Sequence, residues 1–186
     1  IGGITKENGF VEGETISAGI ETKGVGGGVC QVSTTMYNAA VRANLNILSR
    51  HNHSKPVDYA AEGTDCAVSD GYKDFIFTNP YQTPIYIDTK ADGHHVVCTI
   101  FGHGAEKPYV IDLSPERIRT IPAGENWQNT PELKKGEVKV VQKREDGSFY
   151  KTYKVYKQGN REIKRELANT SRYTPVDGKY LKGISD

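Results

Sequence analysis

The sequence lacks the features that mark several large classes of protein. No run of residues approaches the length of about 20 apolar side chains that crosses a bilayer as a helix, and nothing near Ile1 reads as a signal peptide. Lysine and arginine number 24 and aspartate and glutamate 23, so the net charge is close to zero. Nucleic-acid binding through phosphate neutralisation needs a basic excess, and the composition argues against it.

Cysteine is scarce and widely spaced. The chain holds 3 cysteines, Cys30, Cys66 and Cys98, and no CxxC pair. An odd number at these spacings indicates neither a disulfide framework nor a zinc site, and we expect no metal and no cofactor. Cys66 and Cys98 are interpreted as core residues, because the alternating run HHVVCTIF around Cys98 is typical of a half-buried strand.

Glycine and tyrosine are plentiful, with 20 and 11 residues, and indicate a β-rich chain with many turns. One stretch instead has helical spacing and predicts an amphipathic helix from about Cys30 to about Ala43. Its expected apolar face comprises Val29, Val32, Met36, Ala39, Ala40 and Ala43.

Three strand-like runs follow, Phe75–Thr78, Ile85–Thr89 and Val96–Phe101, with an Asp-Gly turn between the last two. They predict an antiparallel meander. Residues 50–65 are expected to form an extended loop with one short strand.

The second half of the chain reads differently. Residues 103–127 resemble a boundary and a linker, and from Glu137 apolar and charged residues alternate as in a thin sheet with one apolar face. That face is expected to hold Val138, Val140, Tyr153, Val155 and Ile163. Nothing in this half resembles a catalytic constellation.

The predicted fold is therefore α+β: an antiparallel sheet with a helix that carries the cysteine at its N-terminus, plus a small all-β C-terminal domain. The domains are predicted at residues 1–104 and 105–186.

The segment GVGGGVC places Cys30 at the start of the predicted helix. Unpaired amides and the helix dipole stabilise a thiolate there, so the thiol pKa of about 8.5 should fall. The glycines allow a sharp turn and the close approach of a substrate carbonyl, and the local amides could form an oxyanion hole. The competing interpretation is a buried cysteine that caps a glycine-rich turn.

A thiol nucleophile needs a base, and His51 and His53 would share one face of an extended segment. Either could serve. Arg50 could bind a substrate carboxylate in a bidentate pair. Asp58 and Asp65 are candidates for orienting an imidazole, although both residue types are also common in turns.

The strings GVGGGVCQVSTTMYNAAVRANL, RHNHSKPVDYAAEGTDCAV and DFIFTNPYQTPIYI resemble the VanW-like domain family (vancomycin B-type resistance protein W). The resemblance runs from about Ile1 to about Gly102, and its core, GGGVCQVSTT followed by R-H-x-H-S-x-P-V, is long and specific. Cys66 departs from the family, whose members usually carry a small residue there.

The remainder, including TIPAGENWQNTPELKKGEVKVVQKREDG and YTPVDGKYLKG, resembles a G5 domain. This is a small β-rich module of surface proteins that handle cell-wall polymers. A glycine that the family tends to carry after the VVQ run is replaced near Lys143 and Arg144.

The resemblance implies an exported protein of Gram-positive bacteria that acts as an L,D-transpeptidase. In that reaction a thiolate attacks the carbonyl on the L-centre of diaminopimelate in a tetrapeptide stem. D-Alanine leaves, and an amine of a second stem completes a 3-3 cross-link. Cys30 is then the expected nucleophile, with His53 as the first choice of base and His51 as the second.

The expected substrate-binding residues are Arg50, Gly28, Gln31, Ser33, Tyr59 and Asp65. The expected partners are peptidoglycan stem peptides, with no nucleic acid, and the protein is predicted to be a monomer. It is predicted to be extracellular, wall-associated and, in a longer parent protein, anchored to the membrane by a segment before Ile1. The alternatives are a non-catalytic peptidoglycan-binding module, and an endopeptidase or carboxypeptidase in which water replaces the acceptor amine.

Overall fold

The computed structural model describes residues 2–17, 20–103 and 108–185, and strands dominate them. The elements are β1 (Glu12–Ser17), β2 (Ile20–Val25), α1 (Val29–Arg42), β3 (Asn46–Ser49), β4 (Ile76–Thr78), β5 (Ile85–Ala91), β6 (Val96–Gly102), β7 (Val110–Ile121), β8 (Glu125–Lys134), β9 (Val138–Gln142), β10 (Gly147–Gln158), β11 (Arg161–Tyr173) and β12 (Gly178–Ser185). The predicted α+β class is wrong. The described chain is mostly β, with one short helix and several small sheets in place of a single antiparallel sheet.

The strands pair locally. Two-stranded sheets join β1 to β2, β3 to β4 and β5 to β6, and three-stranded sheets have the orders β11-β10-β7 and β8-β12-β9. The three strands predicted between residues 75 and 101 are present, but the predicted meander is wrong because β4 pairs with β3 and β5 pairs with β6. The Asp-Gly turn does join β5 to β6, with Asp92 Oδ1 accepting the backbone N–H of His94 at 3.0 Å.

The buried face of α1 includes Ala40 from the predicted face but is otherwise different from it. Its buried residues are Ser33, Thr34, Tyr37, Ala40 and Val41, whereas Val32 is 36% exposed. The hydroxyls of Ser33 and Thr34 donate to the carbonyl of Cys66 at 2.6 and 3.3 Å. These hydrogen bonds turn the polar side of the first helical turn toward the core. The spacing of apolar residues alone does not predict this orientation.

The main core joins the two halves of the chain. It consists of Tyr37, Val41, Cys66, Ile111, Leu113 and Tyr156. The predicted linker at residues 103–127 is therefore wrong, because β7 and β8 occupy most of it and Ile111 and Leu113 of β7 are buried against α1. Each such side chain contributes about 1.5–3 kcal/mol when fully buried. The predicted boundary between residues 104 and 105 lies outside the described residues.

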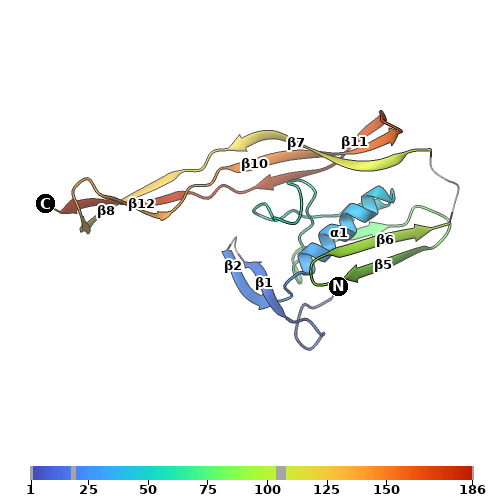
Figure 1. Ribbon diagram of the computed structural model, residues 1–186, viewed down its shortest axis with the longest axis horizontal. Coiled ribbons are helices and arrows are strands. Elements are labelled where there is room, and N and C mark those ends of the chain that lie inside the picture. The colour runs from blue at the N-terminus through green and yellow to red at the C-terminus, as the bar shows by residue number, and fades with distance from the viewer. Residues whose placement is uncertain (1, 18–19, 104–107, 186) are drawn as a thin grey trace.

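The molecule has a compact end and a long thin arm. At the compact end, α1 lies between the β5–β6 hairpin and the β7–β10–β11 sheet, and the arm built from β8, β9 and β12 extends to the C-terminus (Figure 1). Val138, Val140 and Ile163 are 52%, 51% and 43% exposed. The predicted single sheet with one covered apolar face is therefore wrong. Val138 and Val140 lie in the β8-β12-β9 sheet and Ile163 in the β11-β10-β7 sheet, where Val155 is buried.

Candidate active site

Two glycines shape the turn that delivers Cys30 to the start of α1. Gly26 has φ 91°, and a Cβ on it would meet Ile4 Cγ2 at 2.3 Å. Gly28, the N-cap, has φ 85° and the left-handed conformation, with no side-chain cap. Glycine adopts this backbone without strain, so the chain can turn directly into the helix. Cys30 is then the second residue of α1 and is partly buried.

The first turn of α1 leaves two amides next to the sulfur. The N–H of Val29 donates to the carbonyl of Gly26 at 3.2 Å, and the N–H of Val32 donates to the carbonyl of Gly28 at 3.1 Å. Within residues 2–17, 20–103 and 108–185, no acceptor is recorded for the amides of Cys30 and Gln31. Free first-turn amides are the groups that hold an anion at a helix N-terminus.

A chain of three side chains runs inward from the sulfur. Cys30 and His53 line the same cavity, and the imidazole is close enough to lower the pKa of the thiol, while the thiol itself donates to the carbonyl of Val68 at 3.4 Å. His53 Nδ1 lies 2.7 Å from Asp65 Oδ2, and the backbone N–H of His53 donates to the same oxygen, also at 2.7 Å. Thiol, imidazole and carboxylate are thus connected in the order required of a nucleophile, its base and the group that orients the base.

The second oxygen of Asp65 is held just as firmly. Arg50 Nη2 donates to Oδ1 at 3.0 Å, and the hydroxyl of Tyr173 donates to it at 2.6 Å. The side chains of Arg50 and Asp65 are only 4% and 1% exposed. This carboxylate is therefore ionised in a closed, fully hydrogen-bonded site, which is the condition under which a buried charge is tolerated.

Arg50 is part of this frame and not an open anion receptor. Its other hydrogen bonds go to the carbonyls of Asp65 and Gly63 and to the side chains of Asn169 and Ser171. A substrate carboxylate would have to displace these partners to reach the guanidinium. The structure thus differs from the predicted role of Arg50 as a substrate clamp.

The electrostatics favour a charged pair at the sulfur. Burial raises the pKa of the Cys30 thiol, but the neighbouring His53 and the charge of Lys73 bring it below its ordinary value. Burial lowers the pKa of His53, while the hydrogen bond with Asp65 and the charges of Asp65 and Cys30 raise it to about 9. Both shifts are in the direction that favours a thiolate paired with an imidazolium.

The pKa of Asp65 moves in the matching direction. Burial raises it, but the donors on His53 and Tyr173 and the charge of Arg50 hold it below its usual range. The carboxylate therefore stays ionised wherever the thiolate forms, and it stabilises the imidazolium.

A cavity of about 690 Å³ opens onto the sulfur. Of the predicted site residues, it is lined by Cys30, His53, Gly28, Gln31 and Tyr59. The hydroxyl of Tyr59 lies 3.4 Å from His53 Nε2, and the two rings meet edge to face. Asp58 also lines the cavity, but it does not touch the imidazole as Asp65 does, so the two candidates for orienting the base are now distinguished.

Four predicted site residues do not line this cavity: Arg50 and Asp65, which lie behind His53, and His51 and Ser33. His51 is exposed and lines a neighbouring hollow of about 410 Å³, where its Nε2 lies 3.4 Å from Ser49 Oγ. Ser33 is buried and its hydroxyl lies within hydrogen-bond distance of the carbonyls of Cys30 and Cys66, at 3.0 and 2.6 Å. Ser33 thus fixes the first turn of α1 from inside.

Sequence reasoning missed the contribution of β11. Three side chains of β11 contact Arg50 or Asp65, although they follow these two residues in the sequence by more than a hundred positions. They are Asn169, Ser171 and Tyr173. No local motif marks them, since they lie in a charge-rich strand that the sequence predicts to be solvated.

Among the described residues, no cluster of three or more histidine, cysteine, aspartate or glutamate side chains could hold a metal ion. Nor does this part of the chain contain a helix that is both long and apolar enough to span a membrane.

Comparison with known proteins agrees with the motif around Cys30. The family model described as VanW like protein matches residues 1–101. The chain belongs to the VanW-like family. A G5 domain model matches residues 116–184, so this VanW-like chain continues into a G5 module. Both resemblances inferred from the sequence are confirmed.

One curated relative is the Bacillus subtilis (strain 168) protein named "Uncharacterized protein YoaR", which is 38% identical over 122 residues. The match covers 66% of this chain and 38% of YoaR, so the VanW-like chain spans well under half of that relative. A VanW-like region joined to a G5 module indicates a cell-surface protein associated with the cell wall.

Solved structures with some similarity are G5 domains. The G5 domain of an IgA1 protease is 25% identical and has a TM-score of 0.30, covering 45% of this chain and 100% of its own. HP0197-G5 is 14% identical with a TM-score of 0.25, covering 39% of this chain and 97% of its own.

Proposed function

We propose that this VanW-like protein is a cysteine-dependent L,D-transpeptidase that forms 3-3 cross-links between peptidoglycan stem peptides. The observation that carries the proposal is that Cys30 and His53 line one open cavity, with the His53 imidazole held by Asp65 at 2.7 Å. The association with the cell wall supports the choice of peptidoglycan as the substrate class.

In the first half-reaction the Cys30 thiolate attacks the carbonyl carbon between the L-centre of diaminopimelate and the terminal D-alanine. The carbon–sulfur bond forms, and the oxygen gains negative charge. The free amides of Cys30 and Gln31 are suited to stabilise this oxyanion, because they lie at the positive end of α1. His53 then gives its proton to the departing amine, the carbon–nitrogen bond breaks and D-alanine leaves.

In the second half-reaction the side-chain amine of another stem attacks the thioester. The now neutral His53 takes a proton from this amine, the new amide bond forms and the carbon–sulfur bond breaks. Thiolate and imidazolium are restored. Asp65 holds the proton-bearing Nδ1 throughout, so the Nε2 nitrogen faces the reacting atoms in both steps.

Tyr59 is suited to contact the substrate at this point. Its phenol is 41% exposed and lies beside His53 Nε2, within the cavity that holds the sulfur. Its pKa is raised by burial and by the negative charges of Cys30 and Asp65, so the phenol remains a hydrogen-bond donor at neutral pH. Gly28 and Gln31 line the same cavity and leave backbone accessible to a peptide.

The test uses the full chain and purified disaccharide-tetrapeptides. Mass spectrometry of the products should show dimers joined by a 3-3 link and free D-alanine, and the Cys30→Ala variant should make neither. Cys66→Ala is the matched control, because it removes a thiol that is wholly buried and outside the cavity. Unchanged dimer yield from Cys30→Ala would contradict the proposal. Cleaved stems without dimers would identify a hydrolase with the same nucleophile.

A further inference from the structure

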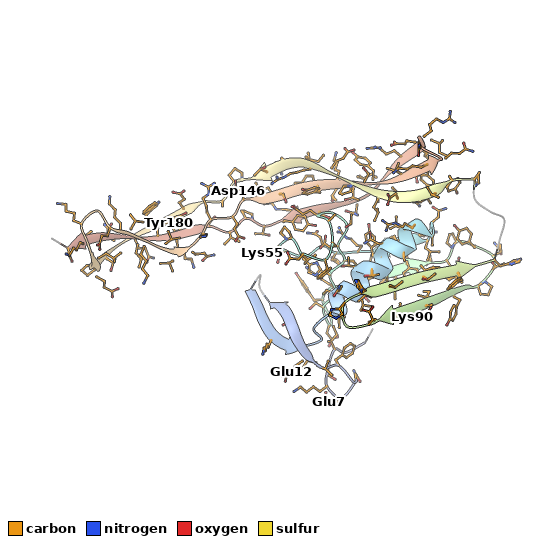
Figure 2. All side chains as sticks on the ribbon, in the orientation of Figure 1. Glu7, Glu12, Lys55, Lys90, Asp146 and Tyr180 are labelled. Carbon is orange, nitrogen blue, oxygen red and sulfur yellow. The ribbon has the colours of Figure 1, made fainter. Side chains whose placement is uncertain are left out.

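The loop that carries His53 and Asp65 is docked on the half of the chain that matches the G5 model. We call residues 50–66 the acid–base loop; it lies beneath β11, and its Lys55 is labelled there (Figures 1 and 2). Several hydrogen bonds join it to β10 and the end of β11. They include Thr174 N–H to Ser54 O (2.7 Å), Asn52 Nδ2 to Arg172 O (2.9 Å), Ser148 Oγ to Glu62 Oε2 (2.6 Å) and Thr152 Oγ1 to Gly63 O (2.9 Å).

Tyr173 lies at the centre of this contact and is only 1% exposed. Its hydroxyl accepts the backbone N–H of Gly63 at 2.6 Å and lies 2.6 Å from Asp65 Oδ1. A phenol has one proton, and an ionised carboxylate only accepts. The proton of Tyr173 is therefore directed at Asp65, and the Gly63 amide fixes the hydroxyl from the other side.

These contacts determine which way the carboxylate faces. Oδ1 is held by Tyr173 and Arg50, and Oδ2 is left for the two N–H donors of His53. Arg50 is itself held to β11 by Asn169 and Ser171. Both groups that restrain Oδ1 thus depend on β11.

We propose that Tyr173 is a positioning residue of the active site, which holds Asp65 in the orientation that supports the His53 imidazolium and the Cys30 thiolate. The G5-matched half then completes the catalytic centre and does not serve only as an attachment module. This inference rests on the assignment of Cys30, His53 and Asp65 in the proposed function.

A closely matched control separates positioning from ordinary stability. The Tyr156 hydroxyl, in the neighbouring strand β10, donates to the carboxylate of Glu166 at 2.7 Å, and Tyr156 is also buried. Tyr173→Phe and Tyr156→Phe therefore each remove one phenol-to-carboxylate hydrogen bond from the same sheet. Only the first variant touches the acid–base loop.

The readout is the rate constant for alkylation of Cys30 by iodoacetamide near neutral pH, followed by peptide mass spectrometry on the full chain. Tyr173→Phe should lower it about tenfold, and Tyr156→Phe should leave it within about twofold, since only Tyr173 is coupled to the thiolate. In a His53→Ala background, Tyr173→Phe should change the rate by less than about twofold, because the path to the sulfur is already broken.

Two results would overturn the inference. One is an unchanged rate in Tyr173→Phe, and the other is an equal loss with and without His53, which would mean a general disturbance of the fold. If Tyr173→Phe does not fold, Ser171→Ala, which removes the 2.7 Å contact to Arg50, must show the same dependence on His53. Alkylation needs no stem peptide, so a protein with the predicted alkylation pattern but no 3-3 dimers would contradict the proposed function and leave the role of Tyr173 intact.

Discussion

His53 Nδ1 lies 2.7 Å from Asp65 Oδ2, and both side chains are nearly closed to water, with 10% and 1% of their surfaces exposed. Because the carboxylate can only accept, this contact places a proton on Nδ1 and leaves Nε2 beside Tyr59, in the cavity that Cys30 also lines. The imidazole is thus fixed in the tautomer and direction that a cysteine acyltransferase needs. His51, two residues earlier, has no such partner in the cavity.

The two histidines should therefore behave very differently. We expect His53→Ala to lower the initial rate of 3-3 dimer formation by about 10²- to 10⁴-fold, the usual contribution of a general acid–base group. His51→Ala should stay within about twofold, because His51 is exposed and lines a separate hollow. An equal loss in both variants would contradict the assignment of the base.

Arg50 should matter for stability because its ion pair is buried. Two arginine–aspartate ion pairs have similar nitrogen–oxygen distances, 3.0 Å in Arg50–Asp65 and 2.9 Å in Arg42–Asp112. The side chains of the first pair are only 4% and 1% exposed, whereas those of the second are 49% and 45% exposed. We expect Arg50→Leu to lower the free energy of unfolding by about 3–5 kcal/mol, since Asp65 keeps a buried charge. Arg42→Leu should cost at most about 1 kcal/mol.

Urea denaturation of the two arginine variants near neutral pH measures this difference through the shift of the midpoint. Similar losses in both would mean that burial of the Arg50–Asp65 pair does not govern its contribution.

The three thiols should react with alkylating reagents at separate rates. Burial raises the pKa of Cys66 to about 12, and burial also raises the pKa of Cys98, whereas the pKa of Cys30 is lowered. Near neutral pH, iodoacetamide should label Cys30 first and Cys66 last, and guanidinium chloride should abolish the order. Labelling of Cys98 ahead of Cys30 in the folded protein would contradict a thiolate at Cys30. Peptide mass spectrometry over a time course provides the comparison.

The sequence was informative where chemistry is local. The sequence alone identified three candidate features: a glycine-rich turn before Cys30, a nearby pair of histidines and an aspartate at position 65. Such a combination of residues is uncommon unless they act together. The short strands and the Asp92-Gly93 turn were also predictable from alternation and turn chemistry. Each of these features is determined by interactions between residues a few positions apart in the sequence, or belongs to a long sequence motif.

The rest depends on how distant segments dock. Val32 is exposed although its spacing suggested burial, because the Ser33 and Thr34 hydroxyls draw the opposite side of α1 toward the Cys66 carbonyl. Arg50 appeared free to bind a substrate, but Asn169 and Ser171 enclose it. Such contacts form only after β11 packs on the acid–base loop, and no periodicity within either segment encodes them.

The central claim is that His53 holds Cys30 as a thiolate, and the pH dependence of Cys30 alkylation tests it most directly in the wild type and in His53→Ala. Alkylation slows as the pH falls through the pKa of the thiol. In His53→Ala the lowering effect of the imidazole is lost while burial still raises the pKa, so the whole profile should move to higher pH by more than about one unit. Profiles that coincide, or a wild-type midpoint above that of His53→Ala, would contradict the account.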